Sequence, residues 1–474
     1  MAAVIHDMVI EGGRVVTPAG MIDADIAVTG GRITALGTGL AAAERVSATG
    51  LIVTPGGIDP HCHIEQMSGM GVMNADTFET ATRSAAMGGT TTSISFAAQG
   101  PGQRLADTVA DYAARAERGA AIDHAFHISI RDTGVPGFEE DLRALIAAGH
   151  RSVKVFTTYD IKLEDAAILD VLRITGEAGA VTCIHAETDA ILAEARARVL
   201  AHGKTAPKYH AEARPRAAEI DAVARMCRFA EVTGAPVMLF HISTAEAVAE
   251  ITAARARGAP VWAETCPHYL FMTEEVLDKP GLEGAKWMCS PPQRTRSDQA
   301  ALWRGLASGV LQIVSSDHAP YRFDASGKLS NGAEAPFPAI ANGLPGLEPR
   351  LPLMFDAMVS GGRLGPVAFT EVTAARAARL YGLPGKGAIA PGFDADLVLW
   401  DPDRQRTYAA DDLHDNVGYN PWEGTTVTGW PVATYLRGQA VMREGEYLGT
   451  AGAGRWTLRP GIGTRAADLT GAPA

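Results

Sequence analysis

The chain has 474 residues, of which 47% are hydrophobic, and its formal net charge is -12. This length is too great for one small core and predicts one large α/β domain with a smaller one beside it. An acidic protein disfavours a nucleic-acid partner, because phosphate backbones bind basic surfaces, so the expected partner is a small molecule.

The cysteines and the N-terminal residues indicate a cellular compartment. The five cysteines are far apart and form no C-x-x-C pair, which predicts reduced thiols and no disulfide framework. The first residues, MAAVIHDMVIEGG, are acidic where a signal peptide would be basic, and no segment is an uninterrupted apolar membrane span. We therefore expect a cytoplasmic protein with no membrane partner.

Short β-rich runs separated by glycines occur at both ends of the chain. MVIEGGRVVT (8–17) and ADIAVTGGRITALG (24–37) have this pattern, and their counterparts near the other end are 387–402 and 425–446. The pattern predicts a β-sandwich domain assembled from residues 1–55 and 385–445.

Residues 56–384 alternate apolar runs with Ala- and Glu-rich helical segments, which is typical of repeated βα units. The apolar runs are 52–63, 91–98, 124–130, 152–159, 181–187, 237–243, 261–266 and 311–317. Eight such runs predict a TIM-type (β/α)8 barrel, whose usual size is about 250 residues without insertions. A doubly wound open sheet is the alternative, but no G-x-G-x-x-G motif opens a helix after the first run.

Residues that can bind metals occur at or near the carboxyl ends of the predicted strands. His61 and His63 alternate along one strand and so point to the same side, although an isolated H-x-H is a weak signal. The other candidates are Lys154, His185, His241 and Asp317. In a barrel these strand ends converge on one face, where active sites are built.

Neutral imidazoles and a carboxylate are ligands that suit zinc and similar divalent ions, and two such ions bind about 3.5–4 Å apart in known hydrolytic sites. Lys154 has two interpretations. It could be a core residue paired with an acid, or its neutral amine could be converted by carbon dioxide to a carbamate that bridges two metals.

The ordered set GGIDPHCHIE, SVKVFTTY, IHAE, LFHIS, TCPHYL, CSPP, SSDHAPY and NGLPGLE resembles the dihydropyrimidinase and hydantoinase family of the amidohydrolase superfamily. The resemblance covers nearly the whole chain, including both β-rich ends. It implies a cyclic amidohydrolase with two divalent metal ions, expected to be Zn²⁺, and with N6-carboxylysine at Lys154.

The resemblance also implies a role for each residue. The first metal would be held by His61, His63, carboxylated Lys154 and Asp317, and the second by the carbamate, His185 and His241. Asp317 would in addition move a proton from the nucleophile to the leaving nitrogen. Tyr159 would donate a hydrogen bond to the developing oxyanion, while the backbone at Ser290 and Asn342 would bind the cyclic amide.

The second residue after the H-x-H motif bears on the substrate. Dihydroorotases and allantoinases resemble one another in placing an arginine there, whereas this chain has Glu65, which would repel a carboxylated ring. An uncharged dihydropyrimidine or 5-substituted hydantoin is therefore expected. The sequence departs from the family pattern at Glu65, usually Asp, and at Thr157 and Thr158, usually Met-Ala.

The loop EQMSGMGVMN (65–74) brings methionines to the predicted cavity mouth, where they would accept a bulky ring substituent or simply pack.

Other functions are considered beside this one. A cyclic imide hydrolase or an allantoinase would need the same metal pair, whereas a non-catalytic scaffold relative would lack the metal ligands that are all present here. Redox chemistry with a dinucleotide is disfavoured by the missing glycine motif. In the resembling family the C-terminal tail packs on a neighbouring subunit, so residues 446–474 are expected at an inter-subunit contact of a homotetramer or homodimer.

Overall fold

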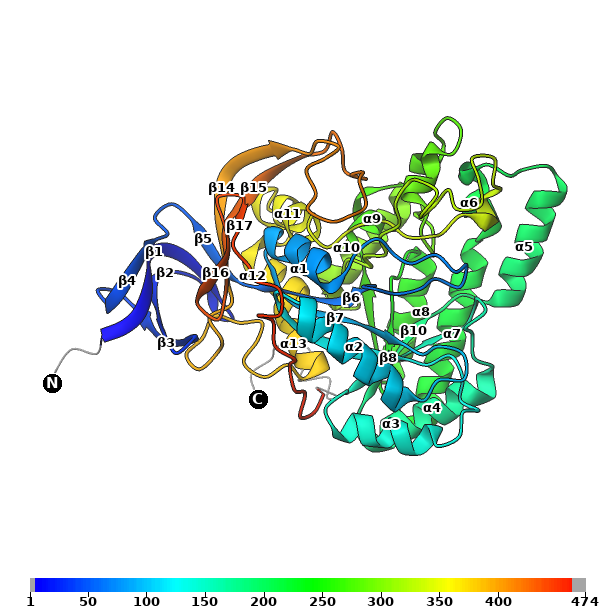
Figure 1. Cartoon of the computed structure of the whole chain (residues 1–474), viewed down its shortest axis with the longest axis horizontal. Coiled ribbons are helices and arrows are strands. Elements are labelled where there is room, and N and C mark those ends of the chain that lie inside the picture. The colour runs from blue at the N-terminus through cyan, green and yellow to red at the C-terminus, as the bar shows by residue number, and fades with distance from the viewer. Residues whose placement is uncertain (1–4, 463–474) are drawn as a thin grey trace.

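Eight parallel strands form a barrel in the computed structural model, which describes residues 5–462 (Figure 1). They pair in chain order, and every predicted apolar run overlaps one of them. The strands are β6 (Gly57–Cys62), β7 (Thr90–Ala98), β8 (Asp123–Ser129), β9 (Ser152–Phe156), β10 (Val181–His185), β11 (Val237–Leu239), β12 (Val261–Thr265) and β13 (Ile313–Val314). Almost every strand residue is buried, because each strand lies between the barrel interior and a helix layer. This topology confirms the predicted (β/α)8 barrel.

Helices lie outside the barrel; most connect its strands, and the last three follow the final strand (Figure 1). They are α1 (Phe78–Met87), α2 (Leu105–Gly119), α3 (Phe138–Ala147), α4 (Asp165–Ala178), α5 (Asp189–Ala201), α6 (His210–Ala213), α7 (Arg216–Thr233), α8 (Ala245–Ala256), α9 (Pro267–Phe271), α10 (Arg296–Ser308), α11 (Arg350–Phe355), α12 (Gly365–Thr370) and α13 (Arg376–Tyr381). Their apolar sides share one large core with the outer faces of the strands. The barrel is therefore a packed scaffold that presents loops at its carboxyl end.

The barrel closes between β13 and β6, although β13 is only two residues long. A single bridge between Cys62 and His318 joins the two edges. The buried guanidinium of Arg350 donates hydrogen bonds to the carbonyl oxygens of Ile58 (3.1 Å) and Val314 (2.9 Å), one on each side of the seam. These contacts hold the first and last strands, with the segments that follow them, in a fixed relation.

A second sheet of nine strands is built from both ends of the chain (Figure 1). Its strands are β1 (Ile5–Thr17), β2 (Gly20–Thr29), β3 (Arg32–Gly37), β4 (Ala41–Ser47), β5 (Ile52–Pro55), β14 (Leu397–Thr407), β15 (Thr426–Leu436), β16 (Gln439–Arg443) and β17 (Glu446–Tyr447). β5 pairs with β1 on one side and with β14 on the other, and residues from both chain ends share one core. The predicted boundaries, 1–55 with 385–445 and 56–384, stay predictions.

The first predicted run, 52–63, is not one strand. Its first part, β5, belongs to the nine-stranded sheet, and its second part, β6, belongs to the barrel. The chain changes sheets at Gly56, where a Cβ atom would lie 2.2 Å from the Thr91 hydroxyl oxygen. Only glycine fits this close approach of the two layers, and a run of apolar residues alone does not reveal the change.

The C-terminal tail, as far as it is described, lies against the amino ends of the barrel strands of its own chain. Thr457 N donates to His124 O (2.8 Å). Arg459 is fully buried and donates to the Ser152 hydroxyl (2.7 Å) and to Phe126 O (2.6 Å). The expected inter-subunit packing of residues 446–474 stays a prediction, and residues 463–474 lie outside the described residues.

A buried ion cluster joins the barrel to the nine-stranded sheet. The Lys386 ammonium lies 2.6 Å from carboxylate oxygens of Asp123 and Asp396 and 3.0 Å from Asp394. Arg437 forms an ion pair with Asp123 from the other side. Three carboxylates of this kind could hold a cation, and here the lysine ammonium occupies that position.

Each cysteine is buried and none is bonded to another among residues 5–462. In the same part of the chain, no helix combines the length and the apolar character that crossing a bilayer requires.

Candidate active site

The six predicted metal ligands lie on barrel strands or within a few residues beyond their carboxyl ends. They are His61 on β6, His63 directly after it, Lys154 on β9, His185 at the end of β10, His241 after β11 and Asp317 after β13. The fold thus brings residues that are more than 250 positions apart in the chain to one end of the barrel.

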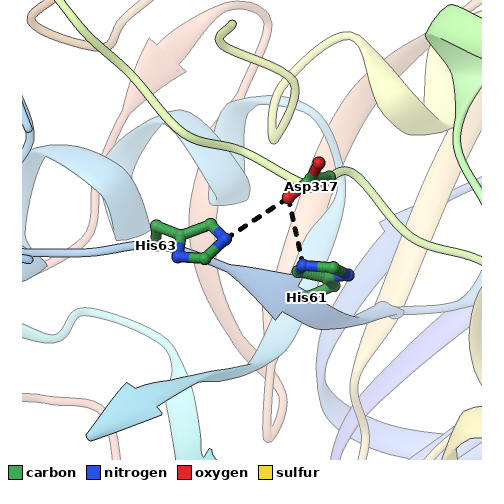
Figure 2. A group of neighbouring side chains, drawn as sticks. All are labelled: His61, His63 and Asp317. Carbon is green, nitrogen blue, oxygen red and sulfur yellow. Dashed lines mark ion pairs between the residues drawn. The ribbon is translucent and has the colours of Figure 1, made fainter. Parts of the chain in front are cut away.

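His61, His63 and Asp317 form a close group (Figure 2). One oxygen of Asp317, Oδ1, lies 3.0 Å from Nε2 of His61 and 3.3 Å from Nε2 of His63. Burial would raise the pKa of Asp317, but the neighbouring histidines hold it well below its usual range. An ionised carboxylate facing two imidazole nitrogens is a donor set that suits a divalent cation.

The opposite ring nitrogens of the two histidines are held by acceptors. Nδ1 of His61 lies 2.5 Å from Oε1 of Glu264 on β12, and Nδ1 of His63 lies 2.7 Å from Oε1 of Gln66. An acceptor at Nδ1 favours the tautomer with its proton there, so Nε2 is the nitrogen of each ring that would bind a metal. In this structure both Nε2 atoms contact Asp317.

The Lys154 amine is buried without a polar partner. The residue is 1% exposed, and Nζ makes no hydrogen bond and no ion pair among the described residues. Its nearest ring is Phe240, with 4.0 Å from Nζ to the ring centroid. Burial lowers the pKa of Lys154 to about 7. A core lysine paired with an acid would have a carboxylate at Nζ, so this environment favours the other interpretation, a neutral amine available to carbon dioxide.

His185 and His241 form a second pair of imidazoles near the first group. Their ring centroids are 4.5 Å apart, and the His241 ring is 5.4 Å from that of His61. Burial lowers the pKa of His185 to about 4 and that of His241 well below its usual value, so both rings are neutral at pH 7. Nδ1 of His241 is buried and has no hydrogen-bond partner among residues 5–462. An unsatisfied buried nitrogen of this kind fits a metal ligand.

Known proteins resemble this chain in sequence and in fold. The model of the amidohydrolase family matches residues 52–441. The D-hydantoinases of Streptomyces coelicolor and Ralstonia pickettii are 41% and 39% identical to the chain, covering 95% and 96% of it and 97% and 99% of their own lengths. The crystal structure of dihydropyrimidinase from Brevibacillus agri superimposes with a TM-score of 0.92 at 38% identity, covering 96% of this chain and 99% of that one.

The chain belongs to the amidohydrolase family. Within it, the chain is a cyclic amidohydrolase of the hydantoinase and dihydropyrimidinase branch, so the family predicted from the sequence motifs is confirmed. The barrel with its additional β domain is the fold of these relatives as well.

Tyr159 of this amidohydrolase follows β9 and lies beside the second pair of histidines. Its backbone has a positive φ of 71°, which is uncommon for a residue other than glycine and recurs at His241 and Asp317. Such conformations collect at functional sites because the surrounding structure must hold them in place. The Tyr159 ring centroid is 5.3 Å from that of His185.

Ser290 and Asn342 belong to two loops that the structure brings together. Gly343 N donates to Met288 O (2.8 Å), which joins the two segments. The Ser290 hydroxyl and the Asn342 side-chain oxygen are both buried, and neither has a hydrogen-bond partner within the described part of the chain. Polar groups in this state are available to a ligand, and the roles predicted for these two loops stay predictions.

The Glu65 carboxylate is paired within the protein, which corrects the expected repulsion of a carboxylated ring. Its carboxylate accepts a hydrogen bond from Phe78 N (3.0 Å) at the start of α1, and its other oxygen lies 4.0 Å from Nε of Arg115. The negative charge is therefore paired with an arginine and a helix N-terminus. Repulsion between Glu65 and a carboxylated ring no longer excludes dihydroorotate.

Three residues in contact with the site were not among the predictions. Glu264 binds His61, Glu187 binds His185 (Oε2 to Nε2, 2.8 Å), and Arg214 contacts Tyr159. Glu187 and Glu264 carry a sequence signal, because each is an acid near the carboxyl end of a predicted apolar run. Arg214 lies in the connection between α6 and α7, where no motif distinguishes it from other arginines.

Proposed function

We propose that this amidohydrolase opens a dihydropyrimidine or a 5-substituted hydantoin at a ring C–N bond and yields an N-carbamoyl amino acid. The observation that supports this most strongly is the buried Lys154 amine, which has no polar partner among residues 5–462. Asp317 and four imidazoles lie at the same end of the barrel, and acceptors hold Nδ1 of His61 and of His63. The names of the relatives, D-hydantoinase and dihydropyrimidinase, support the same ring class.

The residues present fit a pair of divalent metal ions, which we propose to be Zn²⁺. His61, His63, Asp317 and Lys154 as carbamate would hold the first ion, and the carbamate with His185 and His241 would hold the second. Bound there, the ions would supply electrophilic activation of the amide and of the attacking water. The unsatisfied nitrogens of Lys154 and His241 are the structural support for this assignment.

The protein's own residues would then move protons and orient the ring. Asp317 would accept the proton of the attacking water and deliver it to the leaving nitrogen. Tyr159 would donate a hydrogen bond to the oxyanion of the tetrahedral intermediate, and the backbone at Ser290 and Asn342 would align the ring amide.

The loop after His63 favours a ring with an apolar substituent. Met67, Met70 and Met73 are 52%, 39% and 44% exposed, and Met67 and Met73 face each other across an isolated antiparallel bridge. Methionine side chains adapt to varied apolar shapes. Because Glu65 is paired within the protein, the preference for an uncharged ring depends on this loop and on the relatives.

The test begins with bound metal per chain, followed by ring opening of dihydrouracil, several 5-substituted hydantoins, a cyclic imide, allantoin and dihydroorotate. We expect metal-dependent opening of dihydrouracil or a hydantoin, lost on chelation and restored by Zn²⁺. A clear preference for the imide, allantoin or dihydroorotate would replace the proposed substrate. Opening of none of these rings by the metal-loaded protein would refute the proposal.

Tyr159→Phe should lower kcat by about 10²–10³-fold, the usual cost of losing one oxyanion donor, and should leave KM nearly unchanged because the bond forms in the transition state. Steady-state kinetics with the preferred ring and metal analysis of the same sample measure this. Tyr209→Phe, which removes a partly exposed hydroxyl elsewhere, serves as control and should behave as wild type. A normal kcat in Tyr159→Phe would remove Tyr159 from the reaction.

We further propose a cytoplasmic homotetramer or homodimer, as expected for this branch. Light scattering that finds a monomer at micromolar concentration would contradict the assembly, and recovery of the protein outside the cytoplasmic fraction would contradict the location.

A further inference from the structure

Glu187 connects two parts of the site that have different predicted roles. It is fully buried at the end of the loop after β10. Its Oε2 accepts hydrogen bonds from Nε2 of His185 (2.8 Å) and from Nη2 of Arg214, and its Oε1 accepts from Nε of Arg214 (3.1 Å). One carboxylate thus contacts both a proposed metal ligand and a buried arginine.

The direction of each bond follows from the chemistry of the groups. A carboxylate paired with a guanidinium is an acceptor only, so Nε2 of His185 must carry its proton and donate it. The lone pair of that ring is then on Nδ1, which leaves Nδ1 as the nitrogen that can bind a metal. Glu187 therefore determines which ring nitrogen of His185 is available to a metal.

Arg214 acts in the same way on Tyr159. Its Nη2 lies 3.2 Å from the phenol oxygen, and its guanidinium carbon lies 5.1 Å from the ring centroid. Arginine has no acceptor, so Arg214 donates and the phenol oxygen accepts. The single phenol hydrogen is not used in this contact and remains free to donate to a substrate oxygen. A cation on the phenol oxygen also polarises the O–H bond and makes it a stronger donor.

The backbone around this group is also fixed. Glu187 N donates to the Thr157 hydroxyl (2.9 Å), which in turn lies 2.8 Å from Glu187 O. Thr157 belongs to the loop after β9 that carries Tyr159, so the two loops are held together next to the ion pair. Thr157 is one of the three residues, with Glu65 and Thr158, at which the sequence departs from the family pattern.

We propose that Glu187 and Arg214 are a positioning pair that fixes His185 for metal binding at one end and directs the Tyr159 hydroxyl to the substrate at the other. The Tyr159 half of this inference rests on the proposed function, and the His185 half needs only that the site binds metal. A purely structural ion pair would affect folding but would act on neither neighbour specifically.

A double-mutant cycle tests the Tyr159 half. Arg214→Met should lower kcat about 10–100-fold with little change in KM, and should cost less than about 3-fold more in a Tyr159→Phe background, because residues that act as a unit are not additive. Arg214→Lys keeps the charge but cannot span both partners, so we expect it to behave like Arg214→Met. Equal fold losses in the two backgrounds would show that Arg214 does not act through Tyr159.

Metal binding tests the His185 half without any substrate. In Glu187→Gln one acceptor oxygen replaces two, so His185 and Arg214 can no longer both be held. We expect affinity for one of two metal ions to fall about 10–100-fold, as is usual for a lost hydrogen bond to a ligand, measured by competition with a chromogenic chelator. Arg198→Met, which removes an exposed arginine paired with Glu194, should change neither kinetics nor metal affinity. Unchanged metal affinity in folded Glu187→Gln would overturn this half.

The two proposals can fail separately. If the metal-loaded wild type opens no ring, the proposed function fails, while the metal competition still decides the role of Glu187. The Tyr159 half then has a substrate-free readout in the 13Cζ NMR signals of labelled tyrosine. Arg214→Met should shift the one signal that is absent from Tyr159→Phe, and no shift would overturn the assignment.

Discussion

Lys154→Ala should abolish ring opening, with kcat/KM lowered by at least about 10³-fold, more than the loss of one oxyanion donor. The physical reason is that Lys154, as carbamate, would be the single anionic ligand shared by both metal ions. Bound metal per chain should fall in parallel with activity. With 13C-labelled bicarbonate, wild type should show a carbamate carbonyl signal in the NMR spectrum, and Lys154→Ala should lack it.

The pH dependence of the free energy of unfolding, measured on the metal-free protein, is an independent test of the Lys154 environment. Its pKa is lowered by burial from 10.5 to about 7, so between these values the unfolded chain binds a proton that the folded chain does not. The free energy of unfolding therefore rises with pH from about 7 to about 10.5, and the contribution of Lys154 levels off below about 7, where both states bind the proton. Lys154→Met should remove this slope. Lys208→Ala, at an exposed lysine paired with Asp278, should keep activity, metal and slope unchanged.

Full activity in Lys154→Ala would contradict the bridging carbamate and with it the two-metal assignment. Retained metal with lost activity would instead assign Lys154 to the reaction without a role in holding the ions.

The sequence predicted the barrel because parallel strands enclosed on both faces are continuous apolar runs, and because helices separate them. It also predicted the convergence of His61, Lys154 and Asp317, since strand ends meet at one face regardless of their distance in the chain. It did not reveal that 52–63 divides between two sheets. Periodicity shows burial, and both β5 and β6 are buried.

Interactions between distant side chains were not predictable in the same way. Glu65, the second residue after the H-x-H motif, was expected to face the substrate, but its positive φ of 48° turns the chain and its carboxylate binds α1. Arg214 lies in an irregular connection, where the sequence has no hydrophobic periodicity from which its position could be predicted. Lys386 and Arg459 likewise depend on how two ends of the chain meet the barrel, which is set by tertiary packing.

Lys386→Met should lower the free energy of unfolding by about 3–5 kcal/mol, the usual cost of breaking a buried ion pair by removing one partner. Burial opposes the charge on Lys386, but Asp396 and Asp123 outweigh it and raise the pKa of the ammonium. Without the ammonium, Asp394 and Asp396, which directly precede β14, would face Asp123 of the barrel. Urea denaturation followed by circular dichroism measures the loss.

A second substitution distinguishes the loss of charge pairing from the loss of packing in this cluster, by whether it stabilises or destabilises the first variant. If uncompensated carboxylates cause the loss, Asp396→Asn should be destabilising in the wild type but should restore stability to Lys386→Met, because it removes one of the charges left without a partner. If the loss came from packing of the lysine side chain, Asp396→Asn would destabilise both backgrounds equally. Lys208→Met, at an exposed lysine, should change the unfolding midpoint little. A wild-type midpoint in Lys386→Met would show that the cluster does not hold the sheet to the barrel, and the contact between the two would then depend on the apolar packing around β5 and β14.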